Sequence, residues 1–244
     1  MSHQYVLVAD SIGKRYGRRP ILTSASLWAT PGRITAVLGR NGVGKSTLLK
    51  VAAGWIRADY GVVILNDERF VRPRLARLAT LGLFYLPERS LLCSTRTLGQ
   101  HFDVIARLSS RARTEQAVTQ LRLEELLGQR PPSLSGGEQR RAEMALAMAR
   151  GPSCLLADEP FRGIAPTDAE LLAHCLQSMA GEGCALVVTG HEVPTLLHVA
   201  DEVIWLTAGT THVLGTPDEA HSNEQFLREY LGGARPGAPF LSNQ

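Results

Sequence analysis

The sequence predicts an α/β fold with a mainly parallel sheet, and three features indicate it. Short apolar runs alternate with segments in which apolar residues recur at helical spacing. The apolar run at 33–38 leads through a glycine-rich loop into a helical pattern. Another apolar run, at 154–158, ends in acidic residues, and open α/β sheets place their ligands at such strand ends.

The expected strands follow in chain order. Runs at 5–10 and 25–30 indicate an N-terminal antiparallel β-subdomain, and a Pro31-Gly32 turn closes the second run. Later strands are expected at 33–38, 61–66, 82–86, 154–158, 184–190 and 202–207. The helical segments between them favour parallel pairing.

The stretch at 96–127 has a different character, because its apolar residues lie at helical spacing until Gly128 and the Pro131-Pro132 pair interrupt it. We expect a small helical subdomain at about 88–150 within one domain that spans 1–231. Residues 232–244 are rich in glycine and proline and are expected to form a flexible tail.

The composition is that of an ordinary globular chain: 244 residues, of which 44% are hydrophobic and 20% charged. The net charge of +3 comes with scattered arginines, so no nucleic-acid partner is expected. Cys154 and Cys184 lie in apolar runs without metal-binding spacing, which favours core positions in a reducing compartment. No apolar run reaches the ~18 residues of a membrane span, and no leader pattern is evident.

A phosphate-binding loop is predicted at 39–47, where GRNGVGKST fits the pattern G-x-x-x-x-G-K-[ST] between a strand and a helix. Glycines let the backbone N–H groups turn toward a phosphate. Lys45 would reach the β- and γ-phosphates, Ser46 would bind Mg²⁺, and Thr47 would donate toward the α-phosphate. The nucleotide-binding residues expected here are Gly39, Arg40, Asn41, Gly42, Gly44, Lys45, Ser46 and Thr47. The fold is therefore expected to have a P-loop NTPase core that binds a nucleotide and Mg²⁺.

Asp158 and Glu159 end the apolar run CLLADEP at 154–160. Asp158 stands where a P-loop enzyme holds Mg²⁺, and Glu159 is placed to act on the attacking water. Adjacent strand residues point to opposite faces, so the two acids need not share one role.

A second candidate phosphate site lies in PPSLSGGEQRR at 131–141, where Ser135, Gly136 and Gly137 precede a helical pattern. Exposed N–H groups at a helix N-terminus attract anions. The P-loop lies far earlier in the chain, so the residues alone leave open which phosphate this stretch would bind.

The ordered motifs GRNGVGKST, LSGGEQRR, LLADEP and a histidine after the next strand make the chain resemble the ATP-binding cassette (ABC) ATPases. The resemblance covers residues 5–231 and includes the family signature, with Glu138 inserted before Gln139. It implies a head-to-tail dimer, homo- or heterodimeric, in which Ser135, Gly136 and Gly137 contact the ATP bound to the partner's phosphate loop. It also implies that Glu159 and His191 are catalytic and that Tyr16 stacks on adenine.

Two positions differ from the common family pattern. Glu88 stands where the family has a glutamine that ligates Mg²⁺, and a carboxylate can also bind this ion. Arg162-Gly163-Ile164-Ala165 replaces Ser-Ala-Leu-Asp in the dimer-contact loop, so the usual aspartate is absent. These features resemble branched-chain amino-acid importer cassettes, and DEPFRG resembles lipopolysaccharide-export cassettes.

The resemblance implies an ATP-hydrolysing transporter subunit at the cytoplasmic face of the cell membrane, which drives separately encoded membrane permeases. A groove beside Glu88 and the helical insertion is expected to receive the permease. The alternatives are a soluble, non-transport ATPase that acts on ribosomes or DNA, and a regulatory module that does not hydrolyse ATP. The single cassette without a charged linker, the short helical insert, and the presence of both Glu159 and His191 favour the transporter subunit.

Overall fold

The computed structural model describes residues 5–230. One mixed sheet forms its centre, with the strand order β5-β4-β1-β2-β10-β9-β3-β8-β7-β6. The strands are β1 (Leu7–Tyr16), β2 (Arg19–Ala29), β3 (Ile34–Leu38), β4 (Tyr60–Leu65), β5 (Glu68–Phe70), β6 (Leu83–Leu86), β7 (Cys154–Asp158), β8 (Ala185–Thr189), β9 (Glu202–Thr207) and β10 (Thr210–Gly215).

The pairing divides the sheet into a parallel and an antiparallel part, joined by β10, which pairs antiparallel with β9 and parallel with β2. β9, β3, β8, β7 and β6 are joined by parallel pairs. β1 pairs antiparallel with β2 and β4, and β4 pairs antiparallel with β5. The structure thus confirms a mainly parallel core with an N-terminal antiparallel part.

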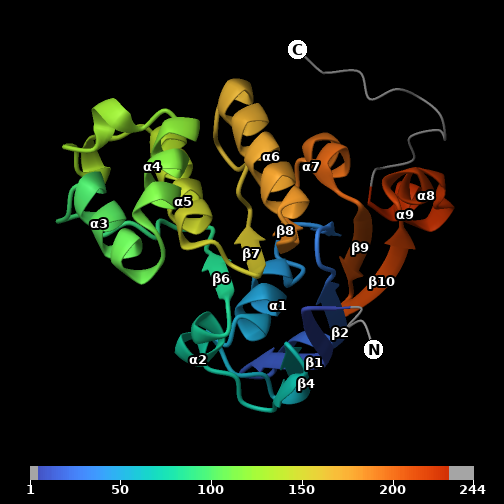
Figure 1. Cartoon of the computed structure of the whole chain (residues 1–244). Coiled ribbons are helices and arrows are strands. Elements are labelled where there is room, and N and C mark those ends of the chain that lie inside the picture. The colour runs from blue at the N-terminus through green and yellow to red at the C-terminus, as the bar shows by residue number, and fades with distance from the viewer. Residues whose placement is uncertain (1–4, 231–244) are drawn as a thin grey trace.

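The helices lie on both sides of the sheet and beside it (Figure 1). They are α1 (Lys45–Ala52), α2 (Leu75–Thr80), α3 (Leu98–Leu108), α4 (Arg111–Gln120), α5 (Gly136–Arg150), α6 (Pro166–Gly181), α7 (Val193–Val199), α8 (Pro217–Ser222) and α9 (Glu224–Glu229), with 3₁₀ turns at Glu124–Leu126 and Pro131–Ser133. α3, α4 and α5 group at one end of the molecule, where α4 and α5 pack on each other.

Two apolar cores flank the sheet. One lies between α1 and the β1–β2 side and contains Leu27, Leu48 and Leu156. The other lies beneath α5, α6 and α7 and contains Met144, Leu155 and Leu196. Strand β7 contributes to both, since its alternate side chains point to opposite faces. Cys154 and Cys184 are buried, as the sequence predicts.

The strand predictions fell on β1, β2, β3, β4, β6, β7, β8 and β9, although β1 and β2 are longer than predicted. β5 and β10 were not predicted from the sequence. β5 follows Asn66 and Asp67, which have φ of 49° and 65°, and β10 follows Ala208 and Gly209, which have φ of 47° and 80°. Two consecutive left-handed residues make the type I′ turn of a tight hairpin, so Asn66, Asp67 and Gly209, which tolerate this backbone, were the available signals.

Residues 232–244, the expected tail, lie outside the described residues.

Candidate nucleotide site

The parallel strands β3, β6, β7 and β8 bring their carboxyl ends to one edge of the sheet. Segments far apart in the sequence follow these ends and surround one hollow. Its lining residues are Tyr16, Ile21, Asn41, Gly42, Gly44, Lys45, Ser46, Thr47, Glu88, Glu159, Arg162 and His191. Parallel pairing therefore collects most of the predicted site in one place.

The loop between β3 and α1 needs glycine for two reasons. Gly42 and Gly44 have φ of 76° and 119°, in the region that L side chains rarely adopt. At Gly44 a Cβ would also lie 2.9 Å from side-chain atoms of Ile21 and Leu22. The loop can therefore fold tightly against β2 and present the first N–H groups of α1 to the hollow.

Lys45 is a buried cation, only 5% exposed. Its Nζ donates to the carbonyl of Gly39 at 2.8 Å and lies 3.5 Å from Oε1 of Glu159. A buried ammonium needs such partners because desolvation penalises its charge. These contacts hold Lys45 at the phosphate loop.

Asp158 ends β7 and is fully buried. Its Oδ1 accepts hydrogen bonds from Ser46 Oγ at 3.0 Å and from Thr189 Oγ1 at 2.8 Å. Its Oδ2 accepts from the Tyr85 hydroxyl at 3.2 Å, and burial together with the Asp158 charge raises the pKa of Tyr85. Three hydroxyls thus orient this carboxylate toward the start of α1.

Thr189 and Tyr85 were not among the residues predicted from the sequence. Each is a polar side chain at or near the end of an apolar strand, β8 for Thr189 and β6 for Tyr85. Polar residues at strand ends on the ligand edge of a parallel sheet were the available signal.

Glu159 is held in an uncommon conformation, with a φ of 52°. Its backbone N–H donates to Thr189 Oγ1 at 3.1 Å. Its Oε2 accepts from Nδ1 of His191 at 2.7 Å, while Oε1 faces Lys45. Non-glycine residues with left-handed backbone are costly and gather at functional sites. The structure thus brings Glu159, His191 and Lys45 together.

The oxygen ligands at the hollow fit Mg²⁺, which prefers one or two carboxylates, a hydroxyl and substrate phosphates. Ser46 and Asp158 already lie 3.0 Å apart, with both oxygens facing each other. Within residues 5–230, no cluster of three or more His, Cys, Asp or Glu side chains forms a complete metal site from protein alone. An ion here would depend on the nucleotide for the rest of its ligands.

Glu88 lines the same hollow, and Oε1 of its carboxylate pairs with Nη1 of Arg162. Sequence analysis gave Arg162 no role in the site. The one sequence feature that pointed to Arg162 is its position in the loop at 162–165, which differs from the family pattern and closely follows Asp158 and Glu159.

Ser135, Gly136 and Gly137 do not line the hollow. Ser135 is instead the N-cap of α5: its hydroxyl accepts from the Glu138 N–H at 3.2 Å and donates to Glu138 Oε2 at 2.8 Å. Hydrogen bonds from the Ser135 backbone and hydroxyl hold the pKa of Glu138 below its usual value. This helix start therefore carries an ionised carboxylate at neutral and mildly acidic pH.

The remaining predicted residues lie as follows. Tyr16, at the end of β1, is 52% exposed and lines the hollow, with Lys14 Nζ 5.6 Å from its ring centre. Gly39 does not line the hollow, but its carbonyl accepts the hydrogen bond from Lys45. Arg40 lines a neighbouring hollow with β9 and Tyr230.

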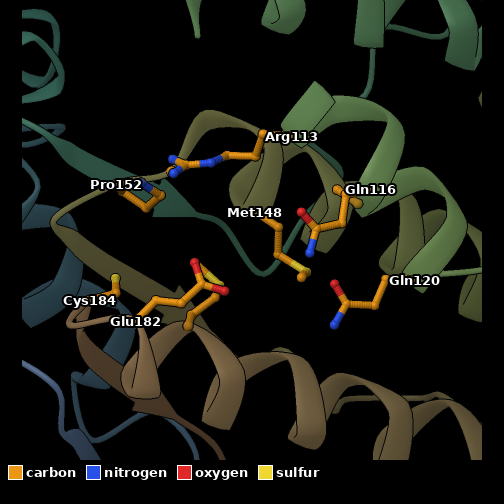
Figure 2. A pocket seen from close by; sticks show the side chains of 10 residues that line it. Arg113, Gln116, Gln120, Met148, Pro152, Glu182 and Cys184 are labelled. Atoms are coloured by element: carbon orange, nitrogen blue, oxygen red, sulfur yellow. The ribbon is translucent and has the colours of Figure 1, made fainter. Parts of the chain in front are cut away.

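Another hollow separates α4 and the end of α5 from α6 (Figure 2). Figure 2 shows Arg113 and Gln116 of α4 on one side of it, Met148 of α5 between them, and Glu182 on the opposite side. None of the predicted site residues lines this hollow. Over the residues described, no helix is both long and apolar enough to span a bilayer.

The phosphate loop between strand and helix, with acids at the end of a neighbouring parallel strand, defines the class of P-loop nucleoside triphosphatases. Comparison with known families makes this more specific. The family model described as ABC transporter matches residues 22–162, and the chain belongs to this family. It is accordingly an ATPase, the cassette subunit of a transporter.

Relatives support this assignment. The lipopolysaccharide export system ATP-binding protein LptB of Escherichia coli K12 is 30% identical over 235 residues, which cover 93% of this chain and 97% of LptB. A nucleotide-free ATP-binding cassette from an ABC transporter has the same fold, with a TM-score of 0.82, 21% identity, and coverage of 93% and 98%. A dimeric cassette bound to ADP and phosphate also has this fold, with a TM-score of 0.76, 20% identity, and coverage of 85% and 98%.

Proposed function

We propose that two cassettes bind two ATP molecules between them and that their ATP-driven association moves a membrane permease. One observation carries this proposal: the hollow contains the phosphate loop, Glu159 and His191 but none of Ser135, Gly136 and Gly137. A helix N-terminus attracts phosphate. The N-terminus of α5 does not line the hollow of its own chain, so it is free to contact the ATP bound to a second chain.

The contact between α5 and the ATP of a second chain would replace the hydrogen bond that Ser135 makes to Glu138 within its own chain. The Ser135 hydroxyl now donates to Glu138, and it would turn to donate to the γ-phosphate. Since ADP has no γ-phosphate, only ATP would gain this bond. Hydrolysis would therefore weaken the association, which is the differential contact that a ligand-driven switch requires.

In the proposed reaction, Glu159 accepts a proton from the attacking water. His191 orients the carboxylate through its hydrogen bond to Oε2, and Lys45 binds the β- and γ-phosphates. Mg²⁺ held by Ser46, Asp158 and the phosphates would neutralise charge on the triphosphate. Tyr16 offers an exposed aromatic face for adenine, and Asn41, Gly42, Gly44 and Thr47 offer loop groups to the phosphates.

The permease is proposed to dock in an apolar groove beside the segment that follows β6. The groove is lined by Phe84, Leu91, Val104, Ile105 and Leu146, with Arg96 and His101 at its side. Leu91 and Val104 are 39% and 55% exposed, which is costly for large apolar side chains without a partner. A helix with one apolar face, presented by an integral membrane subunit, fits such a groove. The chain would then lie at the cytoplasmic face of the membrane.

Glu159→Gln tests the shared site, because the amide keeps the size of the side chain but cannot accept the proton. We expect ATP binding to persist, hydrolysis to fall about 10²- to 10⁴-fold, and Mg-ATP to produce a stable dimer. Light scattering coupled to gel filtration, with Mg-ATP and with Mg-ADP, measures the association.

Glu192→Gln is the matched control, since Glu192 is exposed and follows His191 in the chain. This variant should hydrolyse ATP like the parent. A monomeric Glu159→Gln chain at saturating Mg-ATP would contradict the proposal that two chains share each ATP.

A further inference from the structure

Two side chains that differ from the family pattern meet in the nucleotide hollow. Oε1 of Glu88, in the segment after β6, pairs with Nη1 of Arg162, in the segment after β7. Both residues line the hollow together with Lys45 and Glu159. Their side chains are 31% and 58% exposed, so the pair sits at the open side of the hollow.

The backbone at Glu88 is fixed by a buried ion pair on α5. Arg140 donates to the carbonyls of Pro87 at 3.0 Å and Glu88 at 2.8 Å, and it pairs with Glu143 at 2.9 Å. Glu143 in turn accepts from the Leu91 N–H at 2.7 Å. Both arginine and glutamate are nearly buried. The backbone of Glu88 is therefore held beside the hollow, from where its side chain reaches Arg162.

The charge balance of the hollow depends on Arg162. The ionisable acids that line it are Glu88 and Glu159, and the full cations are Lys45 and Arg162. Arg162 pairs with Glu88 and Lys45 faces Glu159, while the buried carboxylate of Asp158 lies behind Ser46. Without Arg162, the Glu88 carboxylate is unopposed at the proposed site for a polyphosphate anion, and like charges repel.

We propose that Arg162 is a positioning residue that holds and neutralises the Glu88 carboxylate, so that the hollow tolerates an acid beside the nucleotide phosphates. This inference rests on the proposed nucleotide site and adds a residue to it. Mg²⁺ can supply part of the same compensation, because it also neutralises negative charge at the phosphates. The contribution of Arg162 is therefore larger when Mg²⁺ is removed.

A double-mutant cycle tests the inference, using Arg162→Ala, Glu88→Gln, the double variant and the parent chain. Equilibrium binding of a fluorescent ATP analogue is measured in EDTA and in Mg²⁺, at low and at high salt. We expect Arg162→Ala to weaken binding about two- to fivefold in EDTA at low salt. The loss shrinks with Mg²⁺ and with salt, which screens exposed charges. Arg162→Lys retains most of the affinity.

The decisive comparison is made on the Glu88→Gln background, where Arg162→Ala should change the affinity less than twofold, roughly the limit of an additive pair. Arg89→Ala is the matched control, because Arg89 is exposed, adjoins Glu88 and does not line the hollow. An equal loss on both backgrounds, or no loss on either, overturns the inference alone. If the parent and Lys45→Ala bind the analogue equally, the proposed nucleotide site falls, and the inference falls with it.

Discussion

Lys45 shows how much one residue can contribute to the site. Lys45 is the first residue of α1, and its ammonium is nearly buried between the Gly39 carbonyl and the Glu159 carboxylate. A charged donor that replaces part of the water around a phosphate makes a strong, charge-assisted hydrogen bond. Its position 3.5 Å from Oε1 also gives the Glu159 carboxylate a cationic neighbour beside the phosphate loop.

We expect Lys45→Ala to weaken ATP binding about 10- to 100-fold, the usual value of a hydrogen bond to a charged group. Isothermal titration with Mg-ATP measures the loss. Lys50→Ala is the control, because Lys50 lies on the same helix and outside the hollow. Circular dichroism melting separates lost binding from lost folding. Unchanged affinity in a folded Lys45→Ala chain would contradict the phosphate-loop assignment.

The neighbouring glycines of the signature stretch have different surroundings. A Cβ on Gly137 would lie 2.1 Å from Oδ2 of Asp168, the carboxylate that pairs with Arg141 at 3.2 Å. A Cβ on Gly136 would meet nothing closer than the Gly163 carbonyl at 4.0 Å. Substitution of Gly137 therefore disturbs the contact between α5 and α6. Substitution of Gly136 leaves that contact intact, so it can be used to test the surface at the N-terminus of α5.

At the scale of the element, the alanine at position 165, where the family pattern has an aspartate, has a consequence for α6. Ala165 is the N-cap of this helix, with β-region backbone and no side-chain acceptor for the first N–H groups. Pro166 at the next position removes one of those donors, and Asp168 supplies a negative charge in the first turn. The other N–H groups in the first turn of α6 donate no hydrogen bond to the side chain of the N-cap residue.

Ala165→Ser should stabilise the chain by about 1 kcal/mol, because serine is a favoured N-cap and Ala165 is exposed, so that little packing is lost. For a protein of this size the melting temperature should rise by about 2–4 °C. Differential scanning calorimetry measures the shift. Ala165→Leu, which has no acceptor, is the control and should give no gain; an equal gain from both variants would exclude capping as the cause.

At the scale of the whole molecule, the proposed assembly makes each chain half of two sites. One chain supplies the phosphate loop to one ATP and the N-terminus of α5 to the other. Two variants with damage in different halves should therefore complement each other. Lys45→Ala damages the first half, and Gly136→Glu places a negative charge in the second half at a position with free space.

We expect each variant alone to hydrolyse ATP poorly and an equimolar mixture to recover activity. Random pairing in a two-fold dimer would make about a quarter of all sites intact. Phosphate release by the mixture, compared with the mean of the two separate chains, measures this recovery. A mixture that hydrolyses ATP no faster than the mean of the two separate variants would contradict the proposal that sites are shared between chains. Two Lys45→Ala preparations mixed together serve as the blank.

Local sequence predicted most of the fold because element type follows from local periodicity. The apolar runs that became β3, β6, β7, β8 and β9 alternate with helical patterns, and this is typical of a parallel sheet. The phosphate loop and the acid pair were equally local, since each depends on residues adjacent in the chain. The short strands β5 and β10 were not predicted, because they are recognisable from the turns that precede them and not from a run of apolar residues.

The sequence by itself determined the family, the fold class and the candidate residues at 39–47, 135–137, 158, 159 and 191. Only the tertiary structure decided which side chains meet: Thr189 and Tyr85 on Asp158, Lys45 and His191 on Glu159, and Arg162 on Glu88. The physical reason is that such contacts depend on the order in which distant strands join the sheet. That order results from long-range packing, which no short stretch of the chain encodes.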